Sequence, residues 1–346
     1  MPPKDQKLYA LELLRGLCAI GVAGYHYTYW GYGYDLQSLA MFGVYVFFIL
    51  SSLVLMIRYS KVFGEGISPE QAAKFYRNRL ARILPLLMLT ALAAYLFFQF
   101  KYGGQSLAKA ALTGTGLFSL QLPGALSNTP GAWSLGIELA FYAVFPMVCM
   151  ATTKARLSTI CWIMIVLLAA QQVAVTALPS SDDPTFWGQY SMHLTFAPFF
   201  LAGIMIFRSR RREVAYGWLV SLALFAAICG YTFFLPGDLF RGGIPYVALS
   251  AIAVGSVYFA YNTSLPALIL PVARTLGNLS YAVYLSHWLV FQIIHHIDNP
   301  VFRFAAFAIG VSTMSGAIYR WFERPIRDRI RSPRGGSLPQ ITSAAE

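Results

Sequence analysis

The amino-acid sequence predicts an all-α polytopic membrane protein, a bundle of about ten transmembrane helices with both termini cytosolic. Hydrophobic residues make up 57% of the chain and charged residues only 12%, about half the charged fraction of a typical soluble domain. The mean hydropathy is +0.57. Apolar stretches long enough to cross a bilayer recur along the whole chain, with short polar loops between them.

The expected spans follow directly from these apolar stretches. They are residues 8–29, 39–58, 80–100, 132–151, 157–177, 192–207, 213–234, 245–262, 276–297 and 301–321. Residues 103–122 form either an eleventh span or a re-entrant pair of short helices. Residues 1–331 are expected to form one membrane domain, and residues 332–346, with their small polar residues, a disordered C-terminal tail.

The basic residues give the chain its net charge of +12 and also its orientation. With the N-terminus inside, only four of the 26 Lys and Arg residues lie outside, and one more, Arg15, lies within a span. The remainder lie in cytosolic segments, which is the pattern of an inner-membrane protein. The four outside are Lys101, Lys109, Arg241 and Arg303. The charge therefore requires no nucleic-acid partner.

Metal-ligand patterns are absent from the sequence, so no metal is expected. The cysteines Cys18, Cys149, Cys161 and Cys229 lie in or beside spans and have neither metal-ligand spacing nor a disulfide framework.

Arg15 and His26 are the most informative residues of the first span. Eleven residues at about 100° each make three helical turns plus roughly 20°, so both side chains leave the same face, about 16 Å apart along the axis. Ionisable groups at this depth are costly, and their default interpretation is functional. Two structural alternatives stay open: Arg15 could pair with Glu12 one turn away, and His26 could be a hydrogen-bonded core residue.

Five short segments carry a more specific signal because they occur in a fixed order. They are Glu12-Leu-Leu-Arg15-Gly16 followed by His26; Gly43-Val-Tyr-Val-Phe-Phe-Ile-Leu-Ser51; Arg79-Leu-Ala-Arg82-Ile-Leu-Pro85; Trp133-Ser-Leu-Gly-Ile-Glu138 with Phe141-Tyr142; and Leu276-Gly-Asn-Leu-Ser280-Tyr281 through Tyr284-Leu-Ser-His287-Trp288, with Phe322-Glu323-Arg-Pro325 closing the last span. Together they resemble the acyltransferase 3 family of integral membrane acyltransferases, which O-acylate glycans. The resemblance covers about residues 8–330. Ser52-Leu53 and Leu86 depart from the family's usual Gly-Phe and Tyr.

The resemblance implies an O-acyltransferase of the bacterial inner membrane. It would move an acyl group, expected to be acetyl, from cytosolic acyl-CoA to a hydroxyl of a cell-surface or exported polysaccharide. Acetyl-CoA is then the donor, a glycan or lipid-linked saccharide is the acceptor, and membrane lipids surround the protein. Two alternatives stay open. One is a secondary transporter or channel for a small anion or sugar, with Arg15, His26, Glu138 and His287 along its path; the weaker one is a scaffold for glycan assembly.

The catalytic residues expected from the resemblance and from chemistry are His26, Glu138 and Arg15. Imidazole titrates close to neutral pH, so His26 suits general-base removal of the acceptor's proton. Glu138 could orient that imidazole as a triad carboxylate does, or could cap a helix N-terminus. An acyl-histidine intermediate is the alternative to direct transfer.

The expected binding residues fall into two groups. Arg15, Arg79 and Arg82 are assigned to the donor, because guanidinium forks suit bidentate phosphate binding. Ser51, the last residue of the second motif, is also assigned to the donor. Arginines near the cytosolic surface can instead bind anionic lipids. Trp133, His287 and Tyr281 are assigned to the acceptor. For Trp133 an interfacial anchor is the alternative, and for His287 and Tyr281 a core role.

Overall fold

The computed structural model describes residues 8–179, 183, 185–209, 213–234 and 239–330. Within these ranges the chain is helical and contains no strand, so the predicted all-α fold is confirmed. The predicted disordered tail, residues 332–346, lies outside the described residues, as do Lys4, Lys7 and residues 210–212 of the expected cytosolic charge.

Among the described residues, each predicted span overlaps one of the longer helices. They are α1 (Tyr9–Tyr32), α2 (Gln37–Phe63), α3 (Pro69–Tyr102), α6 (Ala132–Lys154), α7 (Leu157–Thr176), α9 (His193–Arg208), α10 (Gly217–Phe234), α11 (Gly243–Tyr261), α12 (Leu270–Ile294) and α13 (Pro300–Ala317). The shorter elements are α4 (Leu107–Thr115), η2 (Leu117–Leu120), α5 (Pro123–Leu126), α8 (Phe186–Tyr190), η3 (Leu239–Arg241), η4 (Ala267–Ile269), a π-helical turn η5 (Ile318–Glu323) and α14 (Arg324–Ile330).

Seven helices of the described chain are long and apolar enough to cross a membrane by length and composition, so the chain is a polytopic membrane protein. They are α2, α3, α6, α7, α10, α11 and the continuous helix Pro300–Ile330. Helix α9 has only 16 residues. Helices α1 and α12 carry Arg15, His26 and His287, and because they pack inside the bundle these polar groups face protein rather than lipid.

The segment between α3 and α6 is not an eleventh span. Gly103, Gly104 and Gly116 have φ values of +68°, +66° and +79°, and these left-handed residues break the chain into short helices. Helix α4 has 9 residues and η2 has 4, whereas a span needs about 20. Of the two alternatives for residues 103–122, only the pair of short helices fits the structure.

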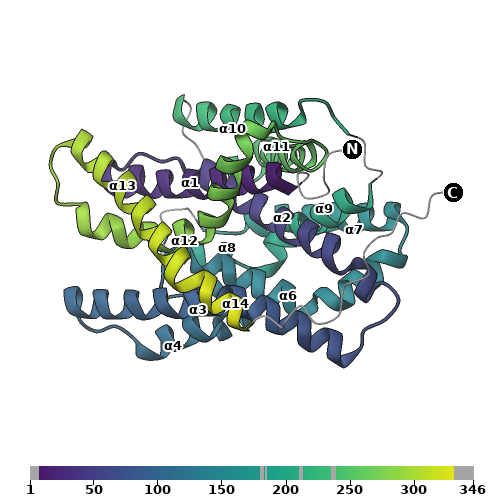
Figure 1. Cartoon of the computed structure of the whole chain (residues 1–346), viewed down its shortest axis with the longest axis horizontal. Helices are drawn as coiled ribbons and strands as arrows, with labels where there is room; N and C mark the ends of the chain where they lie inside the picture. Colours follow the sequence, from purple (N-terminus) through teal and green to yellow (C-terminus); the bar gives the residue numbers. More distant parts are fainter. Residues whose placement is uncertain (1–7, 180–182, 184, 210–212, 235–238, 331–346) are drawn as a thin grey trace.

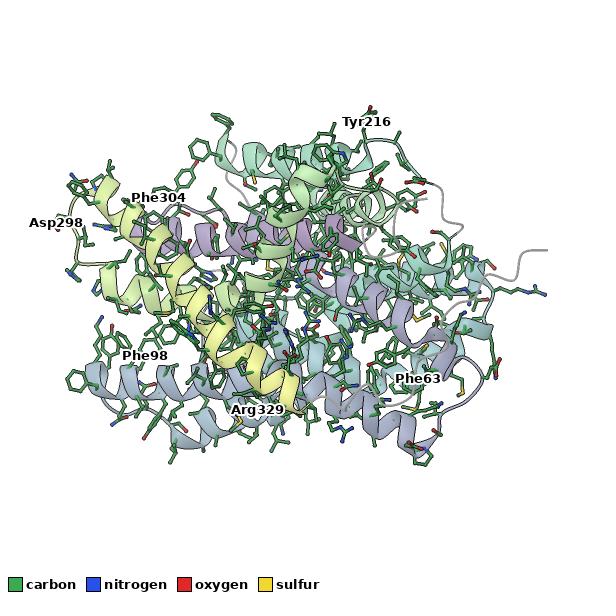
Figure 2. The ribbon with its side chains drawn as sticks, viewed as in Figure 1. Phe63, Phe98, Tyr216, Asp298, Phe304 and Arg329 are labelled. Carbon is green, nitrogen blue, oxygen red and sulfur yellow. The ribbon has the colours of Figure 1, made fainter. Side chains whose placement is uncertain are left out.

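The helices place the polar residues in the middle of the bundle. Figure 1 shows α1 and α2 running through the centre, with α3 and α4 along one edge and α10 along the opposite edge. Asp298 and Phe98 lie near one end of the molecule and Phe63 near the other (Figure 2). Helix α3 therefore runs back towards the end where the α12–α13 loop lies.

Helices α1 and α12 approach one another closely through glycine. A Cβ atom on Gly16 would lie 2.4 Å from Cβ of Leu276, and one on Gly277 would meet the side chain of Glu12. Small residues at such contacts let transmembrane helices pack backbone to backbone. This close approach fixes how α1 and α12 present their polar residues to each other.

We expect Gly16→Ala to destabilise the protein by about 1–3 kcal/mol, because the added methyl group overpacks the contact with Leu276. Gly24→Ala is the matched control: it lies on the same helix, and no atom lies within 4 Å of its added Cβ. Thermal unfolding in detergent should show a lower midpoint for Gly16→Ala alone. Equal midpoints for the two variants would mean that this contact is not tight.

Candidate active site

A cavity of about 850 Å³, part of it open to solvent, lies between α1, α2, α3, α6 and α12. It brings together residues from all five sequence motifs, although these motifs lie far apart along the chain. Its polar lining consists of Glu12, Arg15, Ser51, Arg79, Arg82, Ser134, Glu138, Tyr142, Ser280, Tyr281 and Tyr284. The predicted donor residues and two of the three predicted catalytic residues therefore share one site.

Arg79 and Arg82 contribute two guanidinium groups that form no salt bridge within 4 Å in the described part of the chain, although the carboxylates of Glu12 and Glu138 line the same cavity. Arg79 is only 4% exposed, and its Nε atom is buried without a hydrogen-bond partner. Its guanidinium lies 5.4 Å from the ring centre of Tyr59 and 6.0 Å from that of Tyr142. Arg82, one turn further along α3, lines the same cavity. Buried polar groups are normally hydrogen-bonded, so this end of the cavity suits an anionic ligand.

Arg15 forms the ion pair with Glu12 that the sequence left open, and it also lines the cavity. Its Nη2 atom donates to Oε2 of Glu12 over 2.7 Å and also to the carbonyl oxygen of Gly277, so it does pair one turn away and tie α1 to α12. Because Glu12 neutralises Arg15, the positive charge available to a ligand comes mainly from Arg79 and Arg82.

Glu138 does not orient His26, and this part of the prediction is wrong. Its Oε1 atom accepts hydrogen bonds from the hydroxyl groups of Ser51 and Tyr142, which lie 2.9 Å from each other. These three groups form one wall of the cavity. The hydrogen bonds that the structure gives for Glu138 run to hydroxyl groups on α2 and on its own helix, and none runs to the imidazole of His26.

His26 contacts His287 of α12. Nδ1 of His26 lies 2.9 Å from Nε2 of His287, and the two rings stack at 4.8 Å and 25°. His287 is fully buried, whereas His26 is partly exposed. Both Arg15 and His26 therefore face α12, as their spacing on one helix face predicts. His287 is buried against His26 and does not line the cavity, so the structure gives no support to its assignment as an acceptor-binding residue.

Tyr284 lies between the cavity and the histidine pair. It lines the cavity, and its ring centre is 6.5 Å from that of His287. Its hydroxyl hydrogen-bonds to Ser134 over 2.7 Å and donates to the carbonyl of Gly131 over 3.1 Å. Tyr284 therefore links the cavity lining to the histidine pair, neither member of which lines the cavity itself.

Trp30 is a site residue that the sequence argument missed. It lies four residues after His26, and its ring stacks on that imidazole at 4.5 Å and 30°. The spacing of four on one helix was the available signal. Trp133, predicted as a stacking platform, instead packs against Trp187 and Phe196 and does not line the cavity. Tyr281 does line it, and its hydroxyl donates to the carbonyl of Ile83.

Fold and site together define the chain as a polytopic membrane protein whose buried polar cavity ends beside a pair of histidines. Residues 8–321 match the acyltransferase domain family known as acyltransferase 3, and the chain belongs to this family. Among the described residues, no group of three or more His, Cys, Asp or Glu side chains is arranged to hold a metal ion.

Two relatives illustrate the range of the family. The chain is 27% identical over 334 residues to acyltransferase MdmB of Streptomyces mycarofaciens, covering 86% of this chain and 82% of that one. It is 22% identical over 358 residues to the peptidoglycan O-acetyltransferase OatA of Listeria monocytogenes, covering 92% of this chain but only 55% of OatA. The chain thus spans about half the length of OatA. No solved structure matches the chain.

Proposed function

We propose that the protein transfers an acetyl group from cytosolic acetyl-CoA to a hydroxyl of a glycan on the far side of the bacterial inner membrane. The observation that carries the proposal is that the two ends of the cavity differ chemically. The guanidinium groups of Arg79 and Arg82, which form no salt bridge in the described chain, stand at one end, and the histidine pair lies beyond Tyr284 at the other. An acyl-CoA differs between its ends in a matching way, with phosphates that suit the arginine end and a thioester that suits the histidine end.

The donor enters from the end where α3 begins. Arg79 and Arg82 hold its phosphates, which are too strongly hydrated to enter hydrocarbon. The uncharged pantetheine arm extends past Arg15 and Ser51 towards Tyr284, along a lining that is otherwise mostly apolar. The excess of basic residues in the expected cytosolic segments supports a cytosolic position for the arginine end, where acyl-CoA is made.

His26 acts as the general base. As the acceptor oxygen attacks the thioester carbon, a C–O bond forms, the C–S bond breaks, and the hydroxyl proton passes to the imidazole. The departing CoA thiolate takes that proton and leaves as the thiol, so His26 returns to its neutral state. The direct route needs one chemical step. An acyl-histidine route would instead show ping-pong kinetics.

The acceptor binds where α1 ends, next to His26 and Trp30. Trp30 presents an aromatic ring beside the base, and such rings provide an apolar surface for the C–H face of a sugar. The peptidoglycan O-acetyltransferase among the relatives supports a glycan as the acceptor class.

The test is acetyl transfer by the purified protein in proteoliposomes. We expect label from ¹⁴C-acetyl-CoA to appear in an added oligosaccharide in a base-labile ester, with one CoA thiol released per ester formed. The competing function, a transporter or channel, predicts uptake of sugar or anion into the vesicles without ester formation. Mass spectrometry of surface glycans from cells with and without the gene then identifies the acceptor.

A further inference from the structure

The two imidazoles of the site have a fixed order of hydrogen-bond donors and acceptors. Nδ1 of His287 lies 3.0 Å from the carbonyl oxygen of Val283, and Nδ1 of His26 lies 3.1 Å from that of Val22. A carbonyl oxygen can only accept a hydrogen bond, so each Nδ1 atom carries a hydrogen. In a neutral imidazole the other nitrogen, Nε2, then has a free lone pair.

This assignment decides the direction of the bond between the rings. Nε2 of His287 lies 2.9 Å from Nδ1 of His26, so His26 donates and His287 accepts. The hydrogen on Nδ1 of His26 is shared between Val22 and His287. We propose that His287 is a positioning residue that, together with the carbonyl of Val22, holds His26 in the Nδ1–H tautomer and so leaves its Nε2 atom as the base for the acceptor hydroxyl. The inference rests on the proposed role of His26.

The other arrangements conflict with the surroundings. If His287 donated to His26, the unprotonated Nδ1 of His26 would face the carbonyl of Val22, lone pair against lone pair. If His287 carried two protons, it would be a cation with no exposed surface. The rings beside it are Trp30 at 6.1 Å and Tyr284 at 6.5 Å, and neither provides a negative charge.

A neutral hydrogen-bond partner for His26 also costs less free energy inside a membrane protein than a charged one. In serine hydrolases an aspartate holds the catalytic imidazole, but a carboxylate buried without a counter-ion costs several kcal/mol. His287 accepts the same hydrogen without adding charge. When Nε2 of His26 takes the acceptor's proton, the bond from Nδ1 to His287 becomes charge-assisted and strengthens. His287 therefore stabilises the transition state more than the resting state.

Two substitutions of His287 separate this role from simple packing. In His287→Gln the longer side chain carries its amide to the position of Nε2, so this variant keeps an acceptor for His26. In His287→Asn the shorter side chain carries its amide only to the position of Nδ1, so this variant keeps the bond to Val283 and loses the one to His26. We expect kcat to fall less than about tenfold in His287→Gln and on the order of 100-fold in His287→Asn, with KM for both substrates little changed.

Ser286→Ala is the matched control on the same helix. Ser286 is buried, but its hydroxyl donates to the carbonyl of Ala282 in its own helix, so activity should stay at the wild-type level. The thermal unfolding midpoints of the three variants, compared with that of the wild type, show whether a substitution has disturbed packing. Equal losses of kcat in the glutamine and asparagine variants, or no loss in either while His26→Ala is strongly impaired, would overturn the inference and leave the proposed function standing. Acetyl transfer at the wild-type rate in His26→Ala would instead overturn the role of His26 as the base, which is the part of the proposed function on which the inference rests.

A spectroscopic measurement tests the tautomer of His26 directly in the wild-type protein. In wild-type protein labelled with ¹⁵N-histidine, we expect His26 at neutral pH to show a protonated Nδ1 and an unprotonated Nε2. The signal is assigned by its absence in the His26→Ala protein. A His26 signal with a protonated Nε2 and a bare Nδ1 would contradict the proposed order of donors.

Discussion

His26→Ala is expected to lower the rate of acetyl transfer by roughly 10²–10⁴-fold, the range that a positioned general base contributes. The imidazole is the proton acceptor proposed for the attacking hydroxyl, and the neighbouring imidazole of His287 is fully buried, so it is poorly placed to take over that role. Binding of the donor should survive, because the cavity lining does not include His26. The measurement is kcat for the reconstituted enzyme, together with equilibrium binding of CoA.

His295→Ala provides the control for this experiment. His295 is exposed in the segment after α12, and its ring bonds to the carbonyl of Gln292, so its loss should leave kcat unchanged. A His26→Ala protein that is present in the membrane, binds CoA and still transfers acetyl at the wild-type rate would rule out His26 as the base.

Arg79→Gln and Arg82→Gln are expected to raise KM for acetyl-CoA by roughly 10- to 100-fold each. A hydrogen bond to a charged group is worth about 1.5–3 kcal/mol, and every 1.4 kcal/mol is tenfold in affinity. The decisive comparison uses S-acetyl-pantetheine, a donor with the thioester but no phosphate. Its KM should be the same in the variants and in the wild type, because the guanidiniums act on the phosphates alone.

Lys74→Gln removes one positive charge from the exposed start of the same helix. Its KM for acetyl-CoA should stay near the wild-type value, which separates a direct phosphate contact from a general effect of surface charge. If the two arginine variants raised KM equally for the donors with and without phosphates, the arginines would serve the structure of the cavity rather than the nucleotide.

Helix α1 shows which side-chain relations can be predicted from local sequence patterns. The rotation of about 100° per residue predicts that Arg15 and His26 share a face, and both side chains do contact α12. The pairing of Arg15 with Glu12 follows from the same local geometry and is present. These relations hold within one helix, so they need no knowledge of its neighbours.

Glu138 shows that such patterns do not predict contacts between side chains of different helices. The sequence placed it near His26 because both were expected towards the outer side of the membrane, but depth does not determine the direction of a side chain. In the structure Glu138 faces Ser51 and Tyr142, while His287, 261 residues away from His26, holds the imidazole. Trp133 failed as a platform for the same reason, because α6 turns its ring towards Trp187.

The sequence by itself determined the all-α membrane fold, the polar face of α1, and most of the predicted site residues that line the cavity. Only the tertiary structure decided which of these residues touch. The rotation of each helix is set by packing, such as the contact between Gly16 and Leu276, whereas hydropathy reports only burial in lipid or protein. The contact between His26, the proposed base, and His287 therefore depends on helix packing and not on spacing along the chain.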